Sequence, residues 1–418
     1  MFRACLNATQ GILTVLTHSS SLSQKRSTFK LSRSAMRASI SVMLAAVTLI
    51  ACGHRANAQV FTGDIYPSLG NVQVQNTTTW MQFLSDRLAT NSNSVSNCCA
   101  TNVSCTDGTI FQNNNVQLTS LSSGAGSVNN TCLVALYGDS TSDWSGWAQG
   151  YGLGGNISNN PSAGGLNYSL GGTLFGVDRR LDENLVVGAF GGYTGTSMRD
   201  GVNGSAASMN DYQFGLYQAY GLDQFYVTNV DAFSNDTYGV IRPPVLGVGL
   251  GTASSNSYGN QYSHYTEAGL TLGENGFRLQ PFVGLQYLYL NQHGFTESGA
   301  PPTNLTSGNQ VTNSLRGSLG TRVSQDYFWN GVTLTPSASA RYQHEMGDGQ
   351  PTMTQAFTSA PGVPFSTPGN FLGRDFGLFT IGGNAKLSPN LSLFCTLGAQ
   401  IASYYSAITG SGGFQVQW

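Results

Sequence analysis

Residues 144–418 form a series of alternating segments, each long enough to be a β-strand and each bounded by turn-forming residues. Side chains along a strand point to opposite faces with a period of two. In Phe277–Leu290 apolar residues take the odd positions, and polar residues such as Arg278 and Gln280 take even ones. Pro281 has no backbone N–H, so we expect a local break in the hydrogen-bonded ladder there. The pattern predicts strands with one apolar and one polar face.

We expect twelve strands in this region. Their bounds are Trp144–Leu153, Leu166–Arg180, Leu185–Ser197, Ser208–Tyr220, Phe225–Tyr238, Tyr258–Leu272, Phe277–Leu290, Thr312–Val323, Val332–Glu345, Arg374–Leu387, Leu391–Tyr405 and Gly412–Trp418. Short joins alternate with long ones, the longest being 239–257, 291–311 and 346–373. An even number of antiparallel strands, with short turns at one end and long loops at the other, is typical of a transmembrane barrel.

The composition supports a membrane barrel over a soluble fold. Charged residues make up only 9% of the chain, against ~25% in a typical soluble domain. The mean hydropathy of −0.11 is nearly neutral, as lipid-facing and lumenal residues would average along a strand. A soluble β-sandwich also alternates, but its buried face needs no aromatic residues at the strand ends. The predicted fold class is therefore all-β, a twelve-stranded antiparallel transmembrane β-barrel, in which Cys395 would face lipid as a free thiol.

The segment Ile40–Ala51 is the longest apolar run, and it is too short to span a membrane as a helix. Basic residues precede it, and Ala56, Asn57 and Ala58 follow it. This order predicts a secretory signal peptide over residues 1–58, cleaved before Gln59, with Met36 as an alternative start. Lipidation at Cys52, within a lipobox-like sequence, stays open as the alternative to this cleavage.

Residues 59–143 form a short polar segment before the barrel. Apolar residues at helical spacing predict a helix over residues 79–91, built on Trp80, Phe83, Leu84 and Leu88. Four cysteines follow, and an exported compartment permits disulfides between them in any of three pairings. They are Cys98, Cys99, Cys105 and Cys132. Their spacing does not fit a zinc site, so we expect no metal and no cofactor.

After Ala58 the chain carries eleven basic residues against twenty acidic ones, a difference of −9. This part of the chain therefore lacks the excess of positive charge that binds nucleic acid, and we expect no nucleic-acid partner. On the alternating strands Arg278, Arg316, Arg322 and Arg341 would line the lumen. We favour pairing of these arginines with lumenal acids such as Glu267 and Glu345 over an anion-selective ring.

The chain ends on an alternating strand in which Phe414, Val416 and Trp418 share one face. Its aromatic, glycine-rich opening strand is Trp144–Gly152, and the hairpin that follows pairs Gly171–Arg179 with Leu185–Tyr193. Together with the later strands Asn313–Arg322 and Ala340–Glu345, this order and spacing resembles the C-terminal β-barrel domain of autotransporters, the type V secretion translocators.

This resemblance implies a barrel in the outer membrane, with a helix in its pore and an N-terminal segment in the pore or at the cell surface. Phe414, Val416 and Trp418 would close the barrel and carry its assembly signal. The implied partners are outer-membrane lipid, the barrel assembly machinery and periplasmic chaperones, around a monomeric barrel.

Two other functions stay open beside a translocator or anchor with a very short N-terminal segment. One is a porin-like channel that carries no passenger domain. The other is an outer-membrane hydrolase, because Val134–Asp143 resembles the first block of GDSL esterases around Ser140. Activation of that serine needs a D-x-x-H pair, which the chain does not contain. We therefore expect that the protein is not an enzyme.

Overall fold

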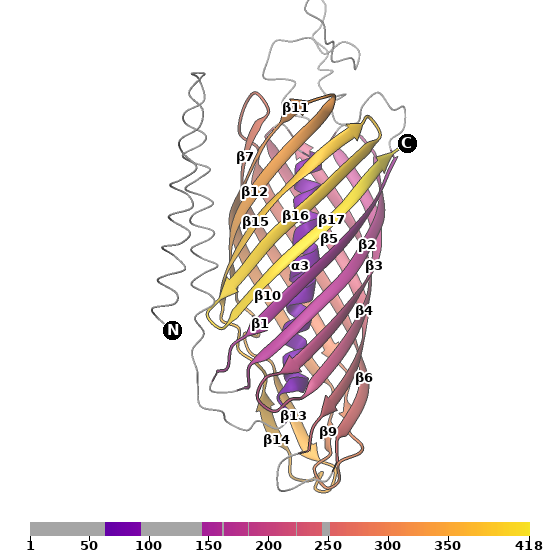
Figure 1. Ribbon diagram of the computed structural model, residues 1–418, viewed down its shortest axis with the longest axis vertical. Coiled ribbons are helices and arrows are strands. Elements are labelled where there is room, and N and C mark those ends of the chain that lie inside the picture. The colour runs from indigo at the N-terminus through magenta and orange to yellow at the C-terminus, as the bar shows by residue number, and fades with distance from the viewer. Residues whose placement is uncertain (1–62, 93–143, 161–162, 183, 223, 245–250) are drawn as a thin grey trace, which may run out of the picture. The chain divides into compact units, whose positions relative to one another are not determined.

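The computed structural model describes residues 63–92, 144–160, 163–182, 184–222, 224–244 and 251–418. The expected signal peptide, the four-cysteine cluster and Ser140 lie outside these residues. Helix α3 (Ile65–Ser92) precedes a set of long antiparallel strands that close into a barrel around it (Figure 1).

Twelve strands of the described residues form the barrel wall. They are β1 (Trp144–Ile157), β2 (Leu166–Arg180), β3 (Leu185–Asp200), β4 (Ala206–Leu222), β5 (Phe225–Arg242), β6 (Ala253–Leu270), β7 (Phe277–Gln292), β10 (Gln310–Gln325), β12 (Val332–Glu345), β15 (Asp375–Ser388), β16 (Leu391–Ala402) and β17 (Tyr405–Gln417). Each strand pairs with the next one in this order, and β17 pairs with β1. The predicted fold class, a closed twelve-stranded antiparallel barrel, is confirmed.

The last hairpin differs from its predicted bounds. Strand β16 ends at Ala402, a turn follows at Ser403 and Tyr404, and β17 already begins at Tyr405. The prediction placed Tyr405 in the preceding strand and began the last strand only at Gly412. Glycine and serine weaken a strand pattern in the sequence, but here β17 is paired on both sides, with β16 and β1. Tertiary pairing therefore extends the strand.

The two ends of the barrel are different. At the turn end, which carries Trp418 and the short joins, only the small strand β11 (Tyr327–Trp329) is added. At the loop end, two of the long joins contribute four short strands to a second sheet (Figure 1). These are β8 (Phe295–Thr296), β9 (Leu305–Ser307), β13 (Thr352–Phe357) and β14 (Phe365–Pro368). Their sequences carry no long alternation, and the prediction left them as loops.

The wall strands keep one face outward and one inward, as the alternation predicts. Arg278 and Gln280 of β7 are buried in the lumen, while Val283 and Leu285 are exposed on the outside. Cys395 is an exposed free cysteine, which confirms its predicted position. The expected break in the ladder is present on one side of Pro281, because the β6–β7 ladder ends at its neighbour Phe282. On the other side the pairing with β10 continues through Pro281.

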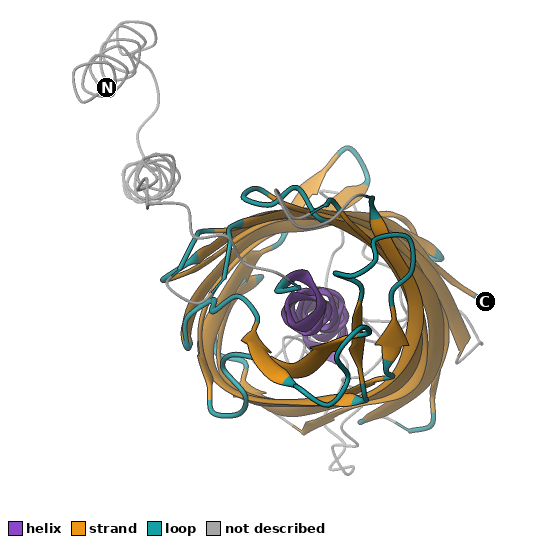
Figure 2. Ribbon diagram, turned by 90° about the horizontal axis from the view of Figure 1, so that it is seen from below, coloured by secondary structure: helices purple, strands orange, loops and turns teal. Residues whose placement is uncertain are grey.

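Helix α3 runs along the inside of the barrel from the loop end to the turn end (Figures 1 and 2). Viewed from the loop end, the helix occupies the centre of the opening and short strands lean across part of it (Figure 2). No helix in the described part of the chain is long and apolar enough to cross a membrane.

Candidate functional site in the barrel lumen

The helix begins well before the residues that the sequence analysis assigned to it, at Ile65 instead of Thr79. Asp64 precedes its first residue and Pro67 lies in its first turn, both of which are favourable places for these residue types. Glycine, asparagine and threonine lower the intrinsic helix propensity of the stretch before Trp80. Contacts inside the barrel therefore have to stabilise this half, as they do most helices in proteins.

Nearly all described side chains of α3 are buried, although about half of them are polar. The buried polar set comprises Ser68, Asn71, Gln73, Gln75, Asn76, Thr77, Thr78, Thr79, Gln82 and Ser85. Buried polar groups are costly unless they are hydrogen-bonded, so such a helix fits only a polar interior. The lumen supplies one, because the inward residues of the wall strands are largely glutamine, threonine, serine and charged groups.

The C-terminal half of the helix, near the turn end, docks on a charged cluster built around Glu267 of β6. Arg322 and Arg341 approach the Glu267 carboxylate at 3.3 and 3.2 Å. Tyr226 and Tyr265 donate hydrogen bonds to it at 2.9 and 2.7 Å. Every polar atom of this buried carboxylate thus has partners, which makes the ionised form tolerable in the interior.

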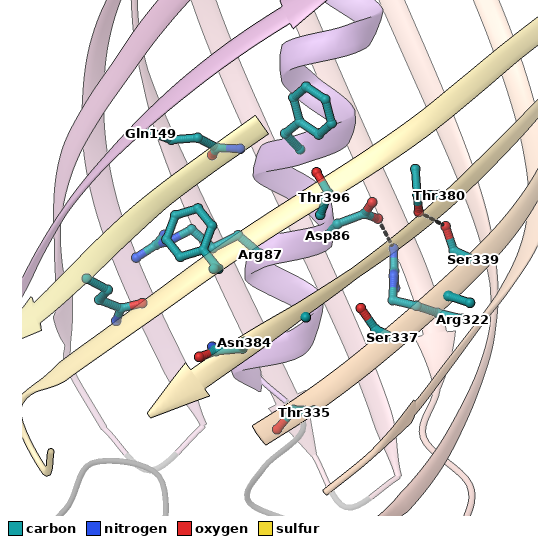
Figure 3. Close-up of a pocket in the computed structure, with 15 residues that line it drawn as sticks. Asp86, Arg87, Gln149, Arg322, Thr335, Ser337, Ser339, Thr380, Asn384 and Thr396 are labelled. Carbon is teal, nitrogen blue, oxygen red and sulfur yellow. Dashed lines mark hydrogen bonds and ion pairs between the residues drawn. The ribbon is translucent and has the colours of Figure 1, made fainter. Parts of the chain in front are cut away.

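Two residues of α3 join this charged cluster. Ser85 donates a hydrogen bond to Glu267 at 3.1 Å. The Asp86 carboxylate pairs with Arg322 at 2.5 Å and lies 3.6 Å from Arg341. Figure 3 shows Asp86 and Arg322 pointing toward one another across the space beside the helix. The helix therefore supplies the second negative charge that the two arginines require.

The next residue of the helix, Arg87, reaches the opposite wall. Its guanidinium pairs with Asp178 of β2 at 2.7 Å and lies over the ring of Trp147 at 4.6 Å. Tyr217 donates to the same carboxylate at 2.8 Å. A Cβ added at Gly188 would lie 2.2 Å from the Tyr217 ring, so the glycine on the neighbouring strand leaves the space that this tyrosine occupies.

The central part of the helix makes hydrogen bonds to carboxylates of β4 and β5. Gln73 donates to Asp211 at 3.1 Å and to Asp236 at 3.0 Å. Asn76 donates to Asp211 at 2.8 Å. On the other side Arg316 pairs with Glu345 at 2.7 Å and donates to Thr78 of the helix at 3.1 Å. Opposite faces of α3 are thus tied to opposite walls.

The loop end holds the first turn of the helix. Tyr66 stacks on Phe295 with 3.7 Å between ring centroids, and its hydroxyl donates to Glu297 at 2.8 Å. Glu297 in turn pairs with Arg242 at 2.6 Å. Gln355 of the small sheet donates to the carbonyl of Gly63 at 2.9 Å. The loops therefore form a clamp on the helix, made of hydrogen bonds and one aromatic stack.

A carboxyl group at this clamp has an altered acidity. Asp64 lies outside the membrane-spanning segments, where Gly164 and Asn203 donate hydrogen bonds to it at 3.0 and 3.2 Å. Burial, aided by the negative charge of Asp200, raises the pKa of Asp64 to about 6.

At the turn end, burial acts to raise the pKa of Asp326, but the hydrogen bonds from Arg278 lower the pKa of this carboxyl below its usual value.

Little open space remains around the helix. A cavity of about 80 Å³ lies beside its C-terminal half, among Asp86, Arg87, Arg322 and hydroxyl groups of the wall (Figure 3). Thr380 and Ser339 face each other across β15 and β12 and share a hydrogen bond of 2.6 Å there. The volume admits a few water molecules. It is far too small for a folded segment of chain.

The residues proposed from the sequence fall into three groups in the structure. Arg278, Arg316, Arg322 and Arg341 are all buried and inward-facing, and each pairs with an acid. Phe414 and Val416 lie on the outside of β17 opposite Ala148 and Gly146 of β1. The Trp418 amide donates to the carbonyl of Trp144 at 3.2 Å, at the seam. The four candidate disulfide cysteines lie outside the described residues.

Sequence reasoning missed the lumenal acids that receive the helix, namely Asp178, Asp211, Asp236 and Glu297. The inward positions of Asp178 on β2, Asp211 on β4 and Asp236 on β5 could be inferred from the same alternation that identified the arginines, whereas Glu297 lies in a join and has no such signal. Their partners on α3 could not, because the register of a central helix against the wall leaves no periodic trace in the wall strands.

The barrel region is similar in sequence to known proteins. A family model described as "Autotransporter beta-domain" matches residues 146–398. "Extracellular serine protease" of Serratia marcescens is 24% identical over 273 residues, covering 62% of this chain and 24% of its own length. "Esterase EstA" of Pseudomonas aeruginosa is 25% identical over 236 residues, covering 55% of this chain and 35% of its own length. The chain thus spans only about a quarter to a third of these relatives.

Two solved structures share the fold. The translocator domain of autotransporter NalP from Neisseria meningitidis has a TM-score of 0.54 and 14% identity, covering 66% of this chain and 88% of that one. The beta domain of the Bordetella autotransporter BrkA has a TM-score of 0.51 and 14% identity, covering 66% and 100%. Since the family model also matches more than half of the sequence, this chain belongs to the autotransporter beta-domain family.

Proposed function

We propose that this protein is an outer-membrane anchor whose barrel holds its own N-terminal segment in a closed pore. The barrel lies in the outer membrane, as its family does. Short turns of such barrels face the periplasm and long loops face the outside. The turn end is then periplasmic, and the clamp at the loop end lies at the cell surface.

The observation that carries this proposal is the direction and the fit of α3. The helix begins at the loop end with Ile65 and ends at the turn end with Ser92, so the described part of the chain begins at the end of the barrel that we assign to the cell surface. Ion pairs at Asp86 and Arg87 fix the helix to the wall. Cleavage before Gln59 would leave only a few residues outside the clamp. The protein would then present only a short N-terminal segment before the helix that fills the barrel.

The porin-like alternative requires a conducting lumen. The helix occupies the centre of the barrel, and the cavity beside it measures about 80 Å³. This arrangement favours a closed barrel over a channel.

We further propose that the chain catalyses no reaction. Its proposed partners are lipid, the barrel assembly machinery at the β17 strand and periplasmic chaperones. We also propose that the barrel is a monomer.

The test uses the full chain in the outer membrane of intact cells. A protease-sensitive epitope inserted directly before Gly63 should be cleaved by added protease, and the same epitope in the Ser388–Asn390 turn should be protected. Purified protein in planar bilayers should show no steady conductance. A protected N-terminal epitope together with a steady conductance would favour the porin.

A further inference from the structure

The lumenal face of β4 and β5 carries two buried carboxyl groups that no arginine neutralises. Asp211 and Asp236 lie directly opposite one another on these strands. Among the described residues, no arginine or lysine forms an ion pair with either of them. All eleven basic residues that follow Ala58 lie within the described part of the chain. The two carboxyl groups therefore have no cationic partner in the barrel.

Three other buried acids of the lumen show how such a group is normally neutralised. Asp178, Glu267 and Glu345 are each at most 3% exposed, and each pairs with at least one arginine at 2.7 to 3.3 Å. A buried charge without an opposite charge is strongly destabilising. Asp211 and Asp236 therefore require a positive species that the side chains of the barrel do not supply.

Buried oxygen atoms without a hydrogen-bond partner surround these two carboxyl groups. The Gln73 amide nitrogen lies 3.1 Å from Asp211 and 3.0 Å from Asp236, and the Asn76 amide nitrogen lies 2.8 Å from Asp211. Within the described residues, the side-chain oxygens of Gln73 and Asn76 have no partner, and neither has Ser234 Oγ. Ser234 is 2% exposed and lies beside both carboxyl groups. A half-turn of each amide places its oxygen where its nitrogen now lies.

Gln213 completes this shell of oxygen atoms. It lies directly opposite Ser234 on the same lumenal face, two residues from Asp211. One end of its amide group lies 3.3 and 3.2 Å from the two oxygens of Asp211. The two carboxyl groups, the three amides and the hydroxyl can thus present at least six oxygen atoms to one point. Oxygens about 3 Å apart suit the ligands of Ca²⁺, which lie roughly 2.3–2.6 Å from the ion.

We propose that Asp211, Asp236 and the neutral oxygens around them bind a calcium ion, which ties α3 to the barrel wall. The charge of the ion matches that of two carboxylates, and Ca²⁺ takes six to eight oxygen ligands of these kinds. Mg²⁺ fits less well, because it gives up its water molecules reluctantly and the site is buried. Gln73 and Asn76 come from the helix and the other ligands from the wall, so the ion would link the two.

The expectation that the chain holds no metal rested on the spacing of its cysteines. A site of oxygen ligands drawn from one helix and two strands leaves no such spacing in the sequence, since Asn76 and Asp211 are 135 residues apart. The calcium site goes beyond the proposed anchor function, because binding of the ion depends only on the lumenal geometry.

The first experiment measures calcium binding to the full-length protein in detergent by equilibrium dialysis with radioactive CaCl₂. Wild type should bind one ion with a dissociation constant on the order of 10⁻⁴ M, as in extracellular calcium modules, and MgCl₂ at the same concentration should not displace it. Asp211→Asn combined with Asp236→Asn keeps the shape of both side chains but removes their charge, so the dissociation constant should rise tenfold or more. Asp231→Asn, on the exposed outer face of β5, is the control and should bind as wild type does.

A heat-modifiable band on gels shows that each variant is folded. If the double variant does not fold, Ser234→Ala removes one neutral ligand and should weaken binding severalfold in a barrel that is otherwise intact. Absence of saturable calcium binding by wild type would overturn the proposal and assign a shared proton to the two carboxyl groups. Equal affinity of wild type and the double variant would also overturn it, because the ion would then bind elsewhere.

The second experiment tests whether the ion holds the helix. In wild type, CaCl₂ should slow hydrogen exchange at residues 73–76, and the same segment of the double variant should not respond. The C-terminal end of α3 is held by ion pairs at Asp86 and Arg87 and serves as the internal control. Calcium binding without slower exchange at residues 73–76 would contradict the role of Gln73 and Asn76 as ligands. Neither readout depends on conductance or on surface exposure, so the anchor function and the calcium site can fail separately.

Discussion

The two ends of helix α3 are held in different ways. At the turn end Asp86 and Arg87 make ion pairs with residues of wall strands, which are hydrogen-bonded on both sides. At the loop end Tyr66 and the backbone of Gly63 are held mostly by joins and short strands, through Phe295, Glu297 and Gln355, while Ser255 of β6 adds one hydrogen bond from the wall. Loops open more easily than barrel walls. The difference indicates that the helix is anchored at the turn end and only clamped at the loop end.

The largest effect should come from the centre of the charged cluster. Glu267→Gln removes the charge that both Arg322 and Arg341 face, and losing one partner of a buried ion pair costs ~3–5 kcal/mol. We expect the free energy of unfolding in urea to fall by about that amount. Glu274→Gln, in an exposed turn, is the control and should change little. Equal stability of the two variants would show that the cluster does not hold the barrel together.

A smaller effect is expected from the helix side of the same cluster. Asp86→Ala leaves both arginines paired with Glu267, so the loss should be about 2 kcal/mol, typical of a hydrogen bond to a charged group. Because the helix then keeps an ion pair with one wall only, through Arg87 and Asp178, we expect transient openings in planar-bilayer recordings that wild-type protein lacks. Gln82→Ala, on the same helix but outside the cluster, should stay closed. An equally silent Asp86→Ala variant would argue against anchoring at the turn end.

The clamp at the loop end should contribute less. Tyr66→Phe keeps the stack on Phe295 but removes the hydroxyl that bonds Ser255 and Glu297, a loss of about 1 kcal/mol. Hydrogen exchange should speed up in the first turns of α3 and stay slow around Trp80. Tyr258→Phe, on the exposed outer face, is the matched control. Faster exchange along the whole helix would mean that the two ends are not independent.

The pH dependence of the clamp should be the most local effect. The pKa of Asp64 is about 6 in the folded state against 3.8 for the free group. The folded state therefore holds the proton more tightly, and the stabilisation is complete below about pH 4 and lost as the pH rises through 6. Exchange of the first turn should accelerate from pH 4 to pH 7 beyond the intrinsic rate change. Asp64→Asn should abolish this excess, and an unchanged excess would assign it to another group.

Strand positions were predictable because each wall strand faces two different solvents. Lipid outside and a polar lumen inside impose a period of two, so β2 and β12 begin and end where the sequence predicts. The inward arginines followed from the same pattern. Segments that do not separate two solvents carry no such signal, which is why β8, β9, β13 and β14 were missed and α3 was recognised only in its apolar half.

By itself the sequence determined the barrel, its twelve strands and the two faces of each strand, because local alternation encodes a wall between lipid and water. Only the tertiary structure decided which lumenal acid meets which arginine, how far α3 extends and how its ends are held. These depend on the register of a helix against twelve strands, which involves residues more than two hundred positions apart, as in the pair Asp86 and Arg322. A local pattern cannot specify such contacts, since they arise only when the barrel closes around the helix.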